Sequence, residues 1–171
     1  QLARLRPDLR GNVPTRLRKV REGVVDATVL AAAGLARLGL LEEAHGWALP
    51  PELMLPAPGQ GALALQIRAG DARMADLAAA LHHPETARAV AAERAVLAAL
   101  GTGCSAPVGA LARMEGDMLV LDACFGGEDD RPQTRRRLAA AGAPDTLGQD
   151  MAARLLDARN RPGPLAGKRI V

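Results

Sequence analysis

The chain has 171 residues, of which 49% are hydrophobic, and a formal net charge of +3. Its single Trp, single Phe and lack of Tyr leave no aromatic platform on which bases or sugars could stack, which disfavours single-stranded nucleic-acid binding. The sequence contains no run of 18 apolar residues that would predict a membrane span. Its length and composition indicate one or two small globular units.

Residues 1–69 alternate helix-like and strand-like segments, which indicates part of an α/β layer with a largely buried strand. Pro14 favours the first turn of a helix that ends at Gly23. The segments expected after it are a strand over Val24 to Ala31, a helix over Ala32 to Leu40, a proline-rich linker over Gly46 to Pro58 and a strand over Ala62 to Arg68.

Residues 70–158 indicate a small α+β unit. Asp71 is expected to cap a helix that extends to about Leu81. Turns rich in Gly, Glu and Asp then separate three strand-like segments, which is the pattern of an antiparallel meander. The further predicted elements are helices over Glu85 to Leu100 and Asp145 to Ala158, and strands over Ala106 to Ala112, Met118 to Cys124 and Gln133 to Ala140. We therefore expect units over 1–69 and 70–158, followed by a linker or tail over 159–171.

Two arginines, Arg10 and Arg16, flank the loop RGNVPTR that opens the first helix. The first backbone N–H groups of a helix have no intrahelical acceptor, and guanidinium groups bind carboxylates through paired hydrogen bonds. The loop is therefore a candidate carboxylate site. The alternative is a pair of solvated surface arginines beside an ordinary helix start.

Cys104 lies in the glycine-rich segment GTGCSAPVG, between a predicted helix and a predicted strand. Such a loop can present a sulfur to a ligand, and a helix end or a nearby Arg would favour the thiolate that covalent attachment needs. The alternative is a small hydrophobic residue with no role in binding. Cys124 lies in an apolar strand and is interpreted as structural, and a disulfide between the two cysteines is disfavoured in a reduced cytosolic protein.

Other residue types with catalytic or metal-binding chemistry give weaker signals. His82 and His83 precede Pro84 and have no HExxH or CxxC partner, so capping or surface roles are expected for them. Ser105 lacks the GxSxG elbow and has no candidate His and Asp partners by motif. We therefore predict neither a metal site nor a hydrolase triad.

Three segments, in their order and spacing, resemble hydroxymethylbilane synthase, also called porphobilinogen deaminase. They are RGNVPTRLRKVREGVVDATVLAAAGLARLGL (Arg10 to Leu40), LPAPGQGALALQIR (Leu55 to Arg68) and ERAVLAALGTGCSAPVGA (Glu93 to Ala110). The resemblance extends from Gln1 to about Ala158. It implies a transferase that polymerises four porphobilinogen molecules into hydroxymethylbilane, with release of ammonia at each step, in tetrapyrrole and heme biosynthesis.

The resemblance also implies a domain organisation. Residues 1–69 would be the latter half of domain two, a partial periplasmic-binding-protein-like α/β lobe, together with the strand that crosses back to domain one. Residues 70–158 would be domain three, which bears the cofactor. The family's catalytic aspartate belongs to domain one, so we expect no catalytic residue here and a chain that is incomplete and inactive alone. A first residue Gln1 in place of Met agrees with a natural N-terminus further upstream.

The resemblance assigns site residues by matching positions. Cys104 matches the cysteine that holds the family's dipyrromethane cofactor through a thioether. Arg10 and Arg16 match positions that bind carboxylates of cofactor and substrate, and Arg37 matches one that binds substrate carboxylates. A growing oligopyrrole accumulates acetate and propionate groups, which accounts for the need for several arginines.

The implied partners are porphobilinogen and the growing oligopyrrole, in a monomeric cytoplasmic protein that contacts neither nucleic acid nor membrane. The tail PLAGKRIV (Pro164 to Val171) is similar to the opening of uroporphyrinogen III synthase, so a fusion to that enzyme is one interpretation. A different class of function stays open, namely a non-catalytic carboxylate-binding or interaction module in which Cys104 is only packed. A nucleic-acid binder ranks third, and strong salt dependence would be its sign.

Overall fold

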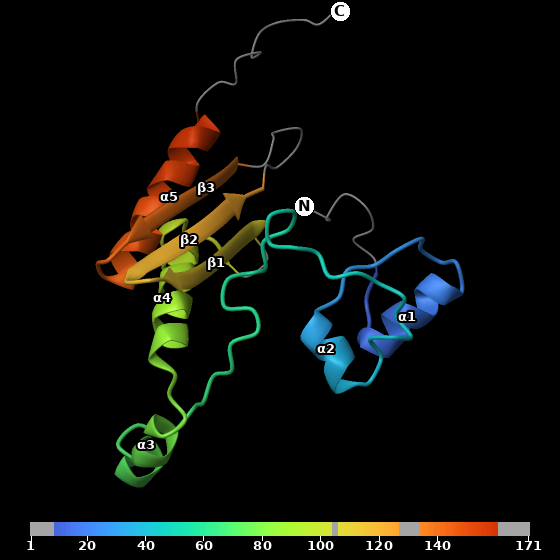
Figure 1. The fold of residues 1–171 in the computed structure, drawn as a ribbon, viewed down its shortest axis with the longest axis horizontal. Coiled ribbons are helices and arrows are strands. Elements are labelled where there is room, and N and C mark those ends of the chain that lie inside the picture. The colour runs from blue at the N-terminus through green and yellow to red at the C-terminus, as the bar shows by residue number, and fades with distance from the viewer. Residues whose placement is uncertain (1–8, 104–105, 127–133, 161–171) are drawn as a thin grey trace, which may run out of the picture. The chain divides into compact units, whose positions relative to one another are not determined.

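The structure is a computed structural model that describes residues 9–103, 106–126 and 134–160 (Figure 1). The chain divides into two compact units, Gln1–Pro50 and Pro51–Val171, which are called here the N-terminal unit and the C-terminal unit. In the described residues, the N-terminal unit has two helices, and the C-terminal unit has three helices and a three-stranded sheet. The α+β region expected from the sequence is therefore present, whereas the described residues of the α/β portion expected over 1–69 contain two helices and no strand.

The N-terminal unit is built on helix α1 (Val13–Arg21) and the short helix α2 (Ala32–Arg37). Proline in the first turn and the side chain of Asn12, which accepts a hydrogen bond from the Thr15 N–H at 3.0 Å, start α1 where the sequence predicts. Leu17 is the buried side chain of α1. Both helices predicted for this unit are confirmed, and α2 ends earlier than expected.

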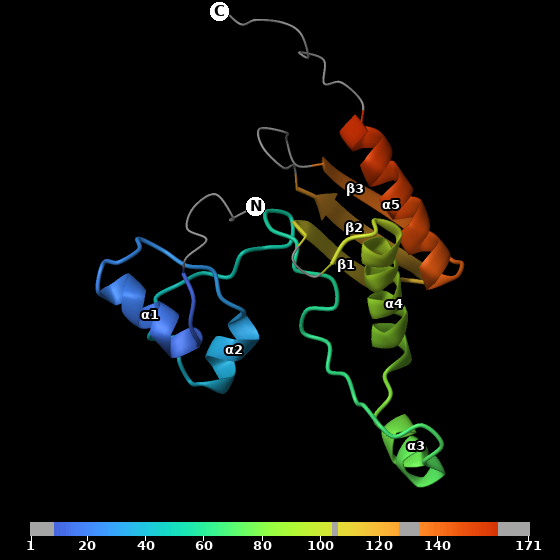
Figure 2. The same cartoon turned by 180° about the vertical axis from the view of Figure 1, so that it is seen from behind.

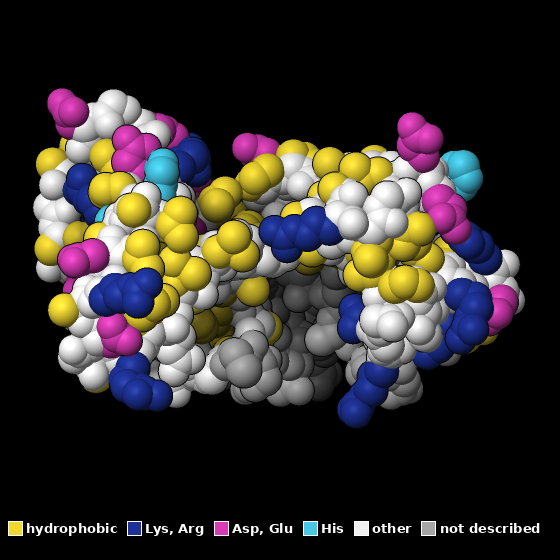
Figure 3. Space-filling view, turned by 90° about the horizontal axis from the view of Figure 1, so that it is seen from below, with side chains coloured by type: hydrophobic (Ala, Val, Ile, Leu, Met, Phe, Trp, Pro, Cys, Tyr) yellow, Lys and Arg dark blue, Asp and Glu magenta, His cyan; other side chains and the backbone are white. Residues whose placement is uncertain are grey.

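The strands predicted over residues 24–31 and 62–68 do not form, so both predictions are wrong. Val24 is 49% exposed and Leu63 is 83% exposed, and a space-filling view shows hydrophobic side chains on the molecular surface (Figure 3). A strand needs a neighbouring strand to satisfy its backbone N–H and C=O groups. Among the residues that the structure describes, neither segment pairs with a strand.

The helices of the C-terminal unit begin at capped ends. The side chain of Asp71 caps α3 (Ala72–Ala79) and that of His83 caps α4 (Pro84–Ala99), each by accepting a hydrogen bond from a backbone N–H. The capping role expected for histidine is thus confirmed for His83. Helix α5 (Pro144–Asn160) matches the last predicted helix.

The three predicted strands form an antiparallel meander in the order β1-β2-β3. They are β1 (Val108–Glu115), β2 (Met118–Phe125) and β3 (Thr134–Ala140). The turn between β1 and β2 pairs Glu115 with Met118 and contains Gly116 at φ +59°. A type II′ hairpin turn favours glycine at this first central position, so the prediction of a turn here is confirmed.

The hydrophobic core lies between the inner face of the sheet and helices α4 and α5 (Figure 2). Strand side chains alternate between faces, so every second residue of β2 enters this core. The fully buried side chains with the largest volumes are Leu119, Leu121, Met151, Leu155 and Val96. The core of the C-terminal unit is thus mostly aliphatic, with Phe125 as an aromatic member.

Residues 51–59, called here the crossing segment, contact the outer face of the sheet at their beginning and helix α4 at their end. Leu55 is 5% exposed, and the Ala110 N–H donates a hydrogen bond to the Pro56 carbonyl oxygen at 2.9 Å. A Cβ atom added to Gly109 would lie 2.9 Å from the Leu55 Cβ and 2.9 Å from the Cys124 Sγ. Glycine at position 109 therefore leaves the room that the crossing segment needs to pack on the sheet.

Candidate functional site

The turn before α1 brings Arg10 and Arg16 into one local structure. Gly11 has φ +126°, and a Cβ added there would lie 2.8 Å from the Thr15 Cγ2, so the turn requires glycine. The Arg16 Nε donates a hydrogen bond to the Gly11 carbonyl oxygen at 2.9 Å, and the Lys19 Nζ donates to the Arg10 carbonyl oxygen at 3.2 Å. The side chains of Arg16 and Lys19 thereby contact the backbone of the turn that precedes α1.

The electrostatics of this turn suit an anion. The first turn of α1 has no acidic residue, and the N-terminus of a helix carries a partial positive charge. Among the described residues, Arg10 forms no ion pair, and Arg16 donates only from its Nε. The terminal nitrogens of Arg16 therefore have no acceptor in the described part of the chain, which leaves them for a carboxylate.

The structure places Arg37 at the last residue of α2, with an exposed side chain. It lies in the same compact unit as Arg10 and Arg16, and no hydrogen bond joins it to either of them in the described residues. The three predicted arginines therefore lie in one compact unit, and no hydrogen bond joins any two of them in the described residues.

Cys104 lies outside the described residues. The described residues before it follow the end of α4, where Gly101 has φ +63°, and β1 begins at Val108. The hydroxyl oxygen of Thr102 is buried and has no hydrogen-bond partner among the described residues. A buried hydroxyl without a partner costs free energy. The Thr102 hydroxyl, which is two residues before the predicted attachment residue in the sequence, therefore has unused capacity for a hydrogen bond.

A buried carboxylate, that of Glu93, was not identified by sequence analysis. Glu93 lies in α4 and is 6% exposed. Its Oε1 accepts a hydrogen bond from the Ala112 N–H at 2.8 Å, and its Oε2 accepts one from the Gly59 N–H at 2.6 Å. One side chain thereby joins α4, β1 and the crossing segment. The available signal was an acidic residue inside the alanine- and valine-rich run of the predicted helix.

Burial raises the pKa of Glu93 above 4.5, and the hydrogen bonds from Ala112 and Gly59 lower it in part. Between the unfolded and the folded pKa the native state binds the proton more tightly, so stability falls as pH rises through this window. We expect Glu93→Gln to abolish this part of the pH dependence, as measured by urea unfolding at a series of pH values.

The exposed Glu85 provides the control for this experiment, because Glu85→Gln removes a carboxylate from the same helix without removing a buried one. It should keep the wild-type slope of unfolding free energy against pH. A Glu93→Gln protein with the wild-type slope would contradict the prediction.

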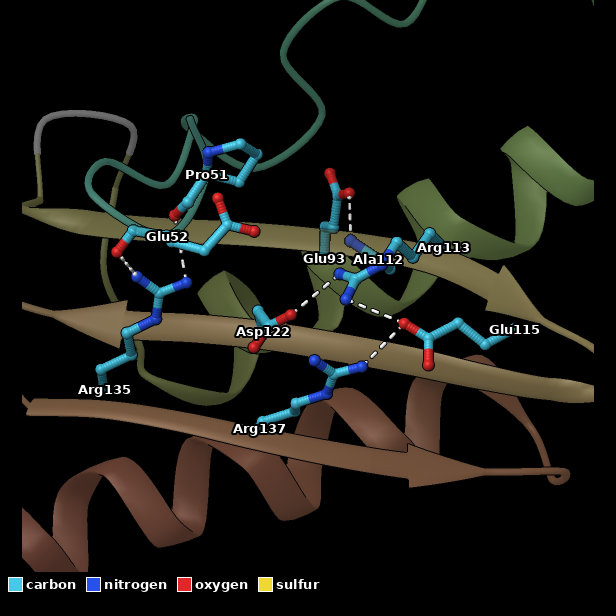
Figure 4. Close-up of polar contacts among 9 residues, drawn as sticks. All are labelled: Pro51, Glu52, Glu93, Ala112, Arg113, Glu115, Asp122, Arg135 and Arg137. Carbon is cyan, nitrogen blue, oxygen red and sulfur yellow. Dashed lines mark hydrogen bonds and ion pairs between the residues drawn. The ribbon is translucent and has the colours of Figure 1, made fainter. Parts of the chain in front are cut away.

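The outer face of the sheet carries a network of ion pairs (Figure 4). Arg113 contacts Asp122 at 2.8 Å and Glu115 at 2.9 Å, and Arg137 contacts Glu115 at 2.7 Å. The hydrogen bond with Asp122 raises the pKa of Arg113. The charges of the two arginines are balanced by those of the two carboxylates, so this network joins the three strands. Each exposed pair contributes about 1 kcal/mol or less to the free energy of unfolding.

The described residues show neither a metal site nor a membrane-spanning helix. No group of three or more His, Cys, Asp or Glu side chains there could hold a metal ion. No described helix is long and apolar enough to cross a membrane.

Comparison with known proteins identifies the family. Residues 1–76 match the family model described as "Porphobilinogen deaminase, dipyromethane cofactor binding domain", and residues 87–157 match "Porphobilinogen deaminase, C-terminal domain". The porphobilinogen deaminase of Roseiflexus castenholzii is 51% identical over 92% of this chain and 54% of its own length. Those of Moorella thermoacetica and Thermus thermophilus are 48% and 45% identical, over 91% and 94% of this chain and 51% and 56% of their own lengths.

The chain thus spans about half the length of the relatives that it matches. The two family models follow one another along the chain. On this evidence the chain belongs to the porphobilinogen deaminase family.

Proposed function

We propose that this chain is the later part of a porphobilinogen deaminase, the transferase that joins four porphobilinogen molecules into hydroxymethylbilane with release of ammonia. The match of nearly the whole chain to relatives of that name, at up to 51% identity among those compared, carries the proposal. The arginine turn before α1 supports it, because porphobilinogen and its oligomers bear carboxylates. In this proposal the chain alone is inactive, since the family's catalytic aspartate belongs to domain one.

The proposed domain organisation follows the resemblance. Residues 1–69 would be the latter half of the periplasmic-binding-protein-like domain two, with the segment that returns to domain one. Residues 70–158 would be domain three, and residues 159–171 a linker or tail. Pairing with strands of the first half of the polypeptide would give residues 24–31 and 62–68 the neighbours that they lack in the described structure.

The residues present fit a dipyrromethane group, which we propose is attached to Cys104. The carboxylates of this group need cationic donors, and Arg10 and Arg16 supply them at the positive end of α1. The buried hydroxyl of Thr102 offers a hydrogen bond close in sequence to the attachment residue. When bound, the group supplies the pyrrole end to which the next porphobilinogen is joined.

The chain's own residues would bind and orient the reactants. The Arg16 guanidinium is fixed by its Nε contact with the Gly11 carbonyl, so its terminal nitrogens need little further ordering when a carboxylate binds. Arg10 would share that carboxylate or bind the next one. Arg37 would bind a further substrate carboxylate from α2.

The intact mass of the protein isolated from its natural source tests the proposal. A chain carrying the mass of two pyrrole units, which also reacts with an aldehyde reagent for pyrroles, is the expected result. A protein without an adduct that still binds carboxylates would instead favour a non-catalytic carboxylate-binding module.

Arg16→Lys should lower kcat/KM for porphobilinogen roughly 10- to 100-fold in the active protein. The reason is that lysine cannot bond Gly11 and hold a carboxylate with a fork, and a hydrogen bond to a charged group contributes about 1.5–3 kcal/mol. Arg18→Lys, on the same helix, is the matched control, because Arg18 is exposed and, among the described residues, its side chain forms only an ion pair with Glu22 at 3.7 Å. Equal effects of the two substitutions would argue against the proposed carboxylate site.

Three further expectations stay predictions. They are a cytoplasmic location, a monomeric state and a fusion to uroporphyrinogen III synthase. The tail that suggested the fusion lies outside the described residues. The length of the natural polypeptide, obtained from the same intact mass, tests the fusion directly.

A further inference from the structure

Arg135 of β3 binds two consecutive backbone carbonyl groups of the crossing segment (Figure 4). Its Nη1 donates a hydrogen bond to the Glu52 carbonyl oxygen, and its Nη2 donates one to the Pro51 carbonyl oxygen at 3.0 Å. The planar fork of a guanidinium can engage two acceptors at once, which an ammonium group on a flexible stem cannot reproduce. Among the described residues no carboxylate forms an ion pair with Arg135.

The two carbonyl groups lie at the start of the C-terminal unit. The boundary between the compact units falls between Pro50 and Pro51. After Glu52 the chain is exposed, with Leu53 69% exposed, and it is next fixed where Leu55 packs on the sheet. The contact with Arg135 is therefore the first contact with the sheet that the described chain makes after Pro50, and the chain that precedes this contact is called here the linker.

We propose that Arg135 is a releasable anchor that sets the length of the linker between the two units. With the anchor closed, the C-terminal unit begins at Pro51. With the anchor open, residues 51–54 join the linker and add about 14 Å of reach at about 3.3–3.6 Å per residue. The hydrogen bonds go to neutral carbonyls on a half-exposed face, so the anchor can open while the rest of the sheet stays folded.

Other parts of the crossing segment do not depend on this anchor. The Pro56 carbonyl accepts its hydrogen bond from Ala110, and the Gly59 N–H donates to Glu93. Opening at Arg135 therefore frees residues 51–54 alone. The inference rests on these contacts and not on the proposed activity, so either can fail without the other.

Limited proteolysis with a glutamate-specific protease tests the anchor, with the cleavage sites identified by mass spectrometry. Cleavage after Glu52 is measured relative to cleavage after Glu22, an exposed residue of the N-terminal unit. We expect Arg135→Ala to raise this ratio roughly five- to tenfold, the factor that a pair of weak hydrogen bonds can supply.

Arg136→Ala is the matched control, because the neighbouring Arg136 is exposed and its side chain bonds only the carbonyl oxygen of Arg135 among the described residues. It removes the same charge and should leave the ratio unchanged. Arg135→Lys, which keeps the charge and lacks the fork, should give an intermediate ratio.

Cleavage after the buried Glu93 reports global opening and should stay slow in every variant. If Arg135→Ala also accelerates cleavage after Glu93, the substitution has loosened the whole unit, and the ratio measured for Arg135→Lys is used to test the proposal instead. If cleavage after Glu93 stays slow, an Arg135→Ala ratio equal to that of Arg136→Ala would overturn the proposal. If Arg135→Ala accelerates cleavage after Glu93, an Arg135→Lys ratio equal to that of Arg136→Ala would overturn it.

Discussion

Gly148→Ala is expected to destabilise the C-terminal unit by about 2 kcal/mol net. A Cβ atom at this position of α5 would lie 2.4 Å from the Ala95 Cβ and 2.5 Å from the Ala92 carbonyl oxygen, both on α4. Such overpacking costs about 3 kcal/mol, the upper part of the usual range, because a backbone oxygen cannot rotate away. The better helix propensity of alanine offsets about 1 kcal/mol of that cost.

The substitution would also disturb the core, because α4 and α5 must separate to admit the methyl group. Val96 and Met151, which are fully buried in that core, would then lose packing contacts. Thermal unfolding followed by circular dichroism should show a decrease in Tm of about 8 °C.

Gly142→Ala provides the matched control for this substitution. An added Cβ at Gly142 would meet no atom within 4 Å, and the residue has no positive φ. Its Tm should therefore equal or slightly exceed that of the wild type. A Gly148→Ala protein as stable as Gly142→Ala would show that the two helices do not need glycine at their contact.

Cys104→Ser is expected to abolish cofactor attachment in the full-length protein, and with it all synthesis of hydroxymethylbilane. A thiolate is a far better nucleophile than a neutral hydroxyl, and serine becomes reactive only beside a general base. The GTGCSAPVG segment contains no basic side chain. Intact mass should therefore show a protein without the two pyrrole units.

Cys124→Ser is the control, because it makes the same chemical change at a residue that is 3% exposed under the crossing segment. It should keep the adduct and lose some stability, since a hydroxyl would replace a thiol in a buried position. An adduct that persists in Cys104→Ser, or disappears in Cys124→Ser, would assign the attachment to a different residue.

Elements with local signals were predicted well. Proline in the first turn of α1, and the caps Asp71 and His83, start helices that the structure confirms. The meander was predictable because a short turn such as the one at Gly116 joins adjacent antiparallel strands. These signals depend on neighbours along the chain, which the sequence contains in full.

The predictions of strands over residues 24–31 and 62–68 were wrong because a strand depends on a partner that is not its neighbour along the chain. Their apolar content indicated burial, yet a strand forms only when another strand satisfies its backbone groups. The chain spans about half of its relatives' length, and the described residues supply no such partner. Hydrophobic pattern alone does not show where the partner comes from.

The sequence by itself determined the family, the cap at Asp71 and the turn at Gly116. It also predicts the residue types of the candidate site, namely arginines for carboxylates and Cys104 for attachment. Only the tertiary structure decided which side chains join distant segments. Glu93 bonds to Gly59 and Ala112, and Arg135 bonds to the carbonyls of Pro51 and Glu52. These contacts link residues 19 to 84 positions apart, and such pairs meet only after the core has placed helix, sheet and crossing segment together.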